Sequence, residues 1–280
     1  MTGPLLARAA VAGVSAAATA GSYRVLVHRL DEDLARWRRT NYAGAPVTLL
    51  AGPAVVAGLV AGTTTSDGLP LGRRLGLSAL VAGVGAVGAY DDLHGHAETK
   101  GLRGHLRALS TARVTTGVVK IGAVAAAGVA AAALLRPRGD TGAAPLLLDG
   151  ALIAGAANLV NLFDLRPGRA LKVVLGCSVL AAAAAGGGLA APLAGAAAAA
   201  LPADLRGSAM LGDCGANALG AVLGFVTTST VPPVARRAAL VTVAGVTLAS
   251  EHVSFSDVIE RHSLLRRIDD WGRPARTTCR

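Results

Sequence analysis

Apolar residues occur along the chain in long blocks, and short polar segments separate these blocks. The blocks are rich in Ala, Val, Leu and Gly, and several approach the roughly 20 residues that a helix needs to cross a membrane. The pattern therefore predicts an all-α protein, a polytopic membrane bundle of about nine transmembrane helices. The predicted helices span residues 4–23, 45–62, 75–90, 114–135, 144–163, 173–186, 189–201, 217–231 and 238–250.

The division between the sixth and seventh predicted helices depends only on three consecutive glycines at 186–188. The sequence therefore leaves the helix count between 173 and 201 open. After the last apolar block the composition changes, so the chain divides into a membrane bundle at 1–250 and a basic cytoplasmic tail at 251–280. Between 254 and 273 apolar residues recur at helical spacing with arginines among them. This pattern predicts an amphipathic helix on the membrane surface, and it leaves open a role in covering a site at the helix ends.

Composition supports a membrane protein and excludes several other classes. The chain is 52% hydrophobic and 16% charged, whereas soluble domains carry about 25% charged residues. Its three cysteines show no paired spacing, so neither a disulfide framework nor a zinc site is expected. The net charge of +10 does not indicate nucleic acid as a partner, because the basic residues are spread among the loops. A cleavable signal is not expected, since Arg8 lies inside the first apolar run.

The basic residues also predict the orientation of the chain. Nineteen of the 27 Lys and Arg residues fall in loops on one side of the predicted bundle, and six fall on the opposite side. The richer side is expected to be cytoplasmic. The N-terminus is then outside, the C-terminus is cytoplasmic, and the protein is a multi-pass plasma-membrane protein whose polar motifs face the cytoplasm.

One of these motifs is a pair of adjacent carboxylates, Asp91 and Asp92, at the cytoplasmic end of the third predicted helix. Adjacent carboxylates repel each other, and a divalent cation is the simplest group that stabilises both. The alternative is a solvated turn, in which an Asp-Asp pair is common.

Two further polar motifs end on the same side. Asn158, Asn161 and Asp164 form one stripe on the fifth predicted helix, where they either serve a site or hydrogen-bond to a neighbouring helix. Asp213 lies in a glycine turn before the eighth helix and either joins the site or caps that helix.

Three acidic motifs from three helices are expected to share one divalent cation, Mg²⁺ or Mn²⁺. A carboxylate-bound metal beside basic loops is typical of phosphoryl chemistry on a nucleotide and a lipid. Lys120, in the fourth predicted helix, either extends to the membrane edge or reaches into the site. The basic residues expected around the metal are Lys100, Arg103, His105, Arg166, Arg169 and Lys172.

These motifs follow the order found in a known family. The chain resembles the polyprenyl-phosphate N-acetylhexosamine-1-phosphate transferases, which include phospho-N-acetylmuramoyl-pentapeptide translocase and the GlcNAc-1-phosphate transferases. The resemblance rests on residues 39–44 (RTNYAG), 88–95 (GAYDDLHG), 100–102 (KGL), 158–164 (NLVNLFD) and 212–216 (GDCGA).

The resemblance implies transfer of a sugar-1-phosphate from a UDP-sugar to a polyprenyl phosphate, with release of UMP. Mg²⁺ is the implied cofactor, with Asp164 and Asp92 as its ligands. The implied partners are the membrane, the lipid phosphate and the UDP-sugar, and a homodimer is left open. Catalytic roles are implied for Asp91, Asp92, Asp164 and Lys100, and substrate contacts for Asn158, Asn161 and Asp213.

The chain departs from the family pattern in three places. Residues 165–172 (LRPGRALK) carry a proline and three cations where the family has small residues, Ala216 replaces a serine, and a late histidine-rich motif is missing. We predict that Arg166, Arg169 and Lys172 take over donor recognition, because guanidinium and ammonium groups bind phosphate. The positive-inside rule alone also predicts basic residues in this loop.

Two alternatives to the transferase remain. A non-catalytic relative would bind polyprenyl phosphate or a cell-envelope partner without turnover. An intramembrane prenyltransferase would require two Asp-x-x-x-Asp motifs on facing helices, and the chain offers only the Asp91–Asp92 pair and the single Asp164.

Overall fold

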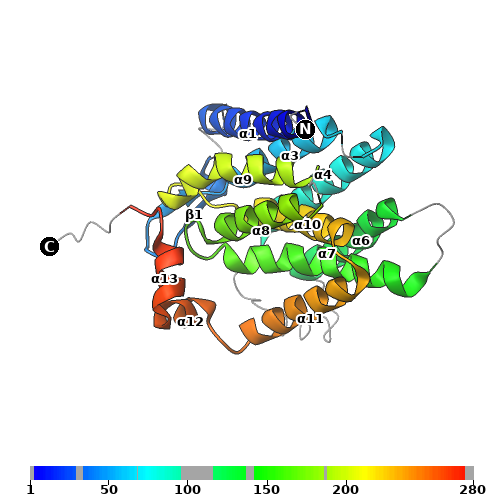
Figure 1. Ribbon diagram of the computed structural model, residues 1–280. Helices are drawn as coiled ribbons and strands as arrows, with labels where there is room; N and C mark the ends of the chain where they lie inside the picture. The colour runs from blue at the N-terminus through cyan, green and yellow to red at the C-terminus, as the bar shows by residue number, and fades with distance from the viewer. Residues whose placement is uncertain are drawn as a thin grey trace.

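The computed structural model describes residues 3–29, 34–67, 69–95, 116–136, 142–185 and 188–274 of the 280-residue chain. Nine helices in this part of the chain coincide with the nine predicted apolar segments, and most extend a few residues beyond them (Figure 1). They are α1 (Gly3–Arg29), α3 (Ala51–Thr65), α4 (Leu71–His94), α6 (Thr116–Leu135), α7 (Ala143–Phe163), α8 (Arg169–Ala185), α9 (Ala190–Leu205), α10 (Gly212–Thr230) and α11 (Pro233–Ser250).

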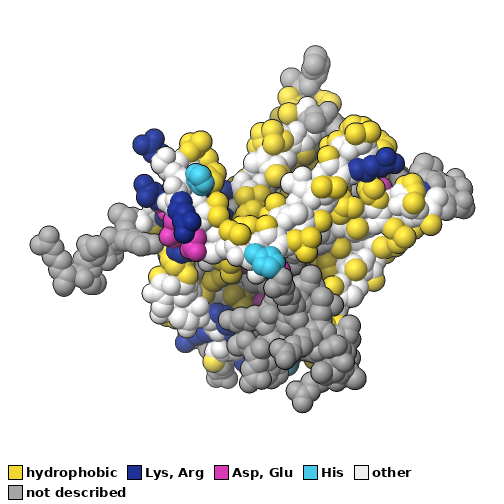
Figure 2. Space-filling view, turned by 90° about the horizontal axis from the view of Figure 1, so that it is seen from below, with side chains coloured by type: hydrophobic (Ala, Val, Ile, Leu, Met, Phe, Trp, Pro, Cys, Tyr) yellow, Lys and Arg dark blue, Asp and Glu magenta, His cyan; other side chains and the backbone are white. Residues whose placement is uncertain are grey.

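The structure supports a helical membrane protein, although it tests only part of the predicted topology. Among the described residues, three helices are long and apolar enough to cross a membrane, namely Pro4–Arg29, Thr116–Leu134 and Ala143–Phe163. A fourth span results if Pro233–Ser250 and Phe255–Arg261, which meet at 97°, are counted as one. Figure 2 shows apolar side chains across the middle of one face and Lys, Arg, Asp and Glu side chains toward its two ends.

Helix α10 lies at the centre of the bundle and packs against α7, α4 and α3. Its Leu219, Val222 and Phe225 side chains are fully buried. A side chain at Gly220 would collide with the backbone of α7 at Ala156, so glycine is required for this close approach. Small residues have the same role in membrane bundles generally, because helices there gain their contact energy from close packing.

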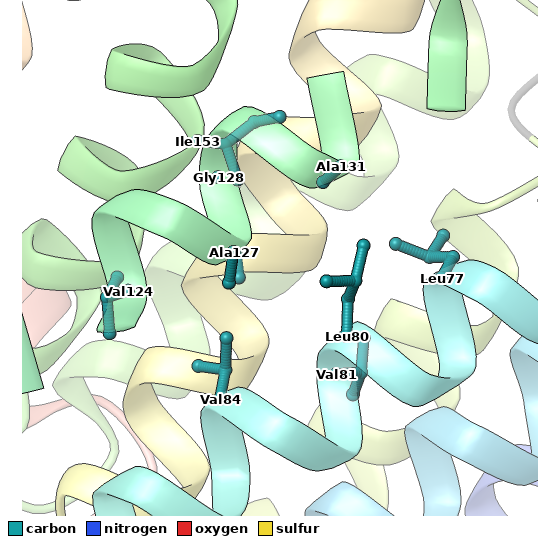
Figure 3. Close-up of a pocket in the computed structure, with 10 residues that line it drawn as sticks. Leu77, Leu80, Val81, Val84, Val124, Ala127, Gly128, Ala131 and Ile153 are labelled. Atoms are coloured by element: carbon teal, nitrogen blue, oxygen red, sulfur yellow. The ribbon is translucent and has the colours of Figure 1, made fainter. Parts of the chain in front are cut away.

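The middle of the contact between α4, α6 and α7 is apolar. Side chains of α4 and α6 enclose a cavity of about 10 Å³. Figure 3 shows Val84 of α4 pointing toward Ala127 of α6, and Leu80 of α4 on the side of Ala131. A cavity of this size is at the lower limit for one water molecule, and its apolar side chains offer no hydrogen bond. This region is therefore a packing seam and not a ligand site.

The loop after α1 departs from the all-α prediction. It contains a short helix, α2 (Leu34–Trp37), and an antiparallel pair of strands, β1 (Arg38–Thr40) and β2 (Pro46–Thr48). The turn between the strands is closed by Asn41, whose Oδ1 accepts hydrogen bonds from the amides of Ala43 and Ala45 at 2.9 and 3.0 Å. Consequently the predicted helix at 45–62 begins only at Ala51.

The tail also differs from the single amphipathic helix that the sequence predicts. It forms two short helices, α12 (Phe255–Arg261) and α13 (Ser263–Asp270), separated by the extended residue His262. Figure 1 shows both helices at the end of the bundle where β1 lies. Leu264, Ile268 and Trp271 are exposed along α13, so this helix retains an apolar surface.

Candidate functional site

Four of the predicted carboxylates meet at one end of the bundle. Asp91 and Asp92 lie in the last turn of α4, Asp164 follows the last residue of α7, and Asp213 lies in the first turn of α10. Their contacts are made across helices, so the convergence that the sequence predicts is present in the structure.

Asp92 binds the N-terminus of α10. Its Oδ1 accepts a hydrogen bond from the Asp213 amide at 2.9 Å, and its Oδ2 accepts one from the Cys214 amide at 3.0 Å. The first amides of a helix have no partner within the helix, and the positive end of the helix dipole favours an anion there. Asp92 thus caps a neighbouring helix with both oxygens, and its predicted role as a metal ligand stays a prediction.

Two glycines make this geometry available. Gly212 adopts a φ of +61° and donates its amide to Asp164 Oδ2 at 2.9 Å. A Cβ atom at Gly88 would lie only 2.5 Å from the carbonyl oxygen of Asp213. The absence of a side chain at Gly88 therefore lets α4 approach the start of α10, and the left-handed Gly212 directs its amide toward Asp164.

Lys120 reaches into the site from α6. Its Nζ lies 2.7 Å from Asp91 Oδ2 and 2.9 Å from Asp213 Oδ2. The alternative in which Lys120 extends to the membrane edge is therefore wrong. The ammonium group takes the position between two carboxylates where a bound cation was expected.

Asp164 is deeply buried at the end of α7, with 6% of its surface exposed. Burial raises its pKa well above the usual value, the charge of nearby Asp204 raises it further, and the Gly212 amide acts in the opposite direction. Asp204 itself accepts a hydrogen bond from the Gly168 amide. The pair Asp164–Asp204 is thus a place where a proton or a cation would be favoured.

The strand pair β1–β2 contacts the site from the side. Arg39 Nη2 donates to the carbonyl oxygen of Asp92, and the guanidinium of Arg166 lies 4.0 Å from the centre of the Tyr42 ring. Residues 39–44, one of the motifs in the sequence, therefore lie next to both the aspartate pair and the basic loop after α7.

The two asparagines of the stripe differ in their surroundings. Asn158 Nδ2 lies 3.5 Å from Thr247 Oγ1 of α11, at the limit of a hydrogen bond, as expected for a residue that joins two helices. Asn161 is half-buried, and its side chain makes no hydrogen bond with the other described residues. Of the two, Asn161 is the one available to a ligand.

The basic loop after Asp164 is bound by the tail. Arg169, with 5% of its surface exposed, makes two hydrogen bonds to Asp269 at 2.8 and 3.0 Å. Arg166 pairs with Glu260 at 3.0 Å, and Lys172 donates to the carbonyl oxygens of Ile268 and Asp269.

The same contact has an apolar part and a second cation. The Phe163 and Phe255 rings stack with their centres 5.8 Å apart. Arg273 donates to the Pro167 carbonyl at 2.9 Å and pairs with Asp269 at 3.0 Å. Burial alone would raise the pKa of Asp269, but the hydrogen bond from Arg169 and the charges of Arg169 and Arg273 hold it below the usual value. The tail therefore covers the three cations that were predicted to bind a donor phosphate.

The positions of the carboxylates decide what kind of metal site this end of the bundle could form. Among the residues that the structure describes, no group of three or more His, Cys, Asp or Glu side chains is placed to hold a metal ion. Mg²⁺, however, is usually held by one or two carboxylates together with substrate phosphates and waters. Asp164 accepts one hydrogen bond, through Oδ2, and Lys120 pairs with the Oδ2 atom of Asp213. These two residues fit an open magnesium site that a diphosphate would complete.

Several residues of the site were missed or left undecided by the sequence. Arg39 belongs to the motif at 39–44, but the sequence assigned it no role of its own. Asp204 and Asp269 carry no motif, and only their position in loops on the same predicted side could have indicated them. The predicted catalytic residue Lys100, together with Arg103 and His105, lies outside the described residues.

The arrangement combines buried carboxylates, cations and helix-terminal amides, which are the kinds of group that bind phosphates and their counter-ions in proteins. Comparison with models of known protein families gives no match, and comparison with curated proteins gives no significant match.

Proposed function

We propose that the chain transfers a sugar-1-phosphate from a UDP-sugar to a polyprenyl phosphate, with Mg²⁺ as cofactor and with UMP as the second product. An oxygen of the lipid phosphate forms a bond to the β-phosphorus of the donor. The bond between that phosphorus and the oxygen bridging to the α-phosphate breaks, and this oxygen leaves with UMP.

One observation carries the proposal: carboxylates from α4, α7 and α10 converge at one end of an apolar helical bundle, next to a basic loop. Buried acids in a membrane bundle are costly and are found mainly at functional sites. Phosphoryl transfer requires such a site, because its catalysis consists mostly of positioning and charge stabilisation.

The four acids would have different roles in this reaction. Asp164 and Asp213 would hold Mg²⁺, which neutralises charge on the diphosphate when bound. Asp92 would fix the turn at the start of α10, since both its oxygens bind amides there. Asp91 would stay paired with Lys120 until a substrate phosphate attracts that ammonium group.

The proposal includes the number of membrane crossings and the orientation of the chain. All nine helices would cross or enter the plasma membrane, with the N-terminus outside and the acidic end of the bundle at the cytoplasmic face. Labelling of single cysteines introduced at Asp67 and Tyr42 from outside intact cells would test it. Modification of position 67 alone is expected, and modification of position 42 alone would reverse the orientation.

The activity is tested with the purified chain in detergent, undecaprenyl phosphate and labelled UDP-N-acetylhexosamines. We expect labelled lipid that requires Mg²⁺, disappears with EDTA and is lost in Asp164→Asn. Asp67→Asn is the matched control, because the Asp67 side chain is 86% exposed and precedes the first residue of α4, whereas Asp91 and Asp92 lie in the last turn of that helix. Folded wild-type protein that labels no lipid from any UDP-sugar would refute the transferase.

A second function has specific support. Lys120 occupies the position between Asp91 and Asp213, and the tail binds Arg166, Arg169 and Lys172. The charges of the site are therefore neutralised by other residues of the chain, without a ligand. A non-catalytic protein that binds polyprenyl phosphate fits this arrangement. It predicts lipid-phosphate binding that survives Asp91→Asn, together with no UMP release from any donor, whereas Asp91-dependent UMP release would rule it out.

A further inference from the structure

A second cavity lies between α1, α3 and α9. Its volume is about 260 Å³, far larger than the seam between α4 and α6. Small residues form its apolar lining, including Ala51 and Ala54 of α3 and Ala200 of α9.

Two arginines lie at one end of this cavity. Arg24 is the last residue that α1 contributes to the lining, and Arg206 follows the end of α9. Both are exposed, and neither side chain makes a hydrogen bond or an ion pair with another described residue. Tyr23, which is half-buried, adds a hydroxyl to the same lining.

The cavity is placed where lipid would surround the protein. Helix α1 lies at the edge of the bundle in Figure 1, and residues Pro4–Arg29 form a candidate span. That span has 26 residues, whereas a crossing uses roughly 20, so a span that begins at Pro4 reaches the head-group level near Arg24. The alanine lining then lies at the depth of the acyl chains.

We propose that this cavity binds an anionic phospholipid of the bilayer, with its phosphate between Arg24 and Arg206 and an acyl chain along the alanines. Charge complementarity selects this occupant. A neutral apolar ligand would use the apolar lining but not the positive charge of the two arginines, and a soluble anion would use the charge but not the lining. The proposal does not depend on the transfer reaction, because none of the acids of the functional site lines this cavity.

The experiment measures binding of phosphatidylglycerol and phosphatidylcholine to the full-length protein in detergent, by native mass spectrometry and by thermal stabilisation. Phosphatidylglycerol should bind the wild type more tightly than phosphatidylcholine. Each arginine near a lipid phosphate contributes about 1 kcal/mol, so Arg24→Gln with Arg206→Gln should weaken phosphatidylglycerol binding on the order of 10- to 30-fold.

Two further variants keep the test specific to this cavity. Arg237→Gln removes an exposed arginine of α11 and should leave lipid binding unchanged. Ala199→Phe fills part of the apolar lining and should weaken phosphatidylglycerol binding while both arginines remain.

Three results would overturn the proposal. They are equal affinity for the two lipids, unchanged phosphatidylglycerol binding in the double arginine variant, and unchanged binding in Ala199→Phe. Stabilisation by inorganic phosphate equal to that by phosphatidylglycerol would assign the arginines to a free anion and would also overturn it.

Discussion

Replacing Lys120 with methionine isolates the charge balance of the acidic site. In the wild type one ammonium group lies between Asp91 and Asp213, at 2.7 and 2.9 Å. Methionine keeps an unbranched side chain of similar length, so packing changes little and the loss is mainly that of the positive charge. The variant leaves two carboxylates facing each other without a cation.

The expected cost follows from burial. Removing one partner of a buried ion pair destabilises a protein by about 3–5 kcal/mol. The Lys120 side chain is 19% exposed, and those of Asp91 and Asp213 are 12% and 20% exposed, so solvent screens part of the interaction. We therefore expect the lower end, about 3 kcal/mol, which corresponds to a fall in Tm of the order of 5–10 °C.

The assay is thermal unfolding of purified protein in detergent, first with EDTA and then with Mg²⁺. A cation that takes the place of the lysine should restore part of the loss. For a Kd near 1 mM, 10 mM Mg²⁺ would return about 1.4 kcal/mol. The wild type should gain less, because Lys120 already holds the position.

Lys172→Met is the matched control. Lys172 Nζ donates to two backbone carbonyls of the tail, so this variant leaves no carboxylate without a cation. It should cost no more than about 1.5 kcal/mol and show no dependence on Mg²⁺. If Lys120→Met in EDTA unfolds at the wild-type temperature, the ammonium does not stabilise the acids and the reasoning is refuted.

Three further outcomes are expected. Asp269→Asn should release the tail, because it breaks the two-point contact with buried Arg169, which is worth about 3 kcal/mol or more. Hydrogen exchange of residues 255–274 should then rise, whereas Glu260→Gln, which removes an exposed pair, should change it little. The pKa of Asp269 in the folded protein lies below its unfolded value of about 4, so its contribution to the stability of the docked tail is full above that pH and is lost as the pH falls further. A fluorophore on the tail should therefore report release only in acid, and release at neutral pH would contradict this. Gly88→Ala should destabilise by about 1–3 kcal/mol through collision with the start of α10, whereas Gly83→Ala in the same helix, where the added methyl meets nothing, should be neutral or stabilising by thermal unfolding.

The helices and the grouping of the acids could be predicted from the sequence, because both depend on local pattern. Apolar blocks mark helices whatever their partners are, and polar residues at the same end of successive spans must meet at one face of the bundle. Asp91, Asp92, Asp164 and Asp213 were found in this way. Helix lengths in the structure leave the number of crossings a prediction, since several helices are shorter or more polar than a crossing requires.

The pairings could not be predicted, because they depend on how far side chains reach between elements that are distant in sequence. Lys120 is 93 residues from Asp213, and Arg169 is 100 residues from Asp269. A single lysine in an apolar helix has the same local pattern whether it extends outward or inward. In the same way, the loop cations follow the positive-inside pattern whether a substrate or the tail binds them.

The contacts of the four acids differ in how easily a ligand could replace them, and this difference gives the order of events expected in the proposed reaction. The partners of Asp92 are two amides of a helix N-terminus, which are fixed by the fold and cannot leave without unwinding α10. The partner of Asp91 and Asp213 is an ammonium group on a flexible four-carbon chain, which can rotate toward an incoming phosphate at little cost. In the proposed reaction Lys120 would therefore rotate away from Asp213, and Asp213 and Asp164 would hold the magnesium ion, while Asp92 keeps the start of α10 in place. The same lysine would then move from the carboxylates to the phosphate, so that its charge stays compensated in both states.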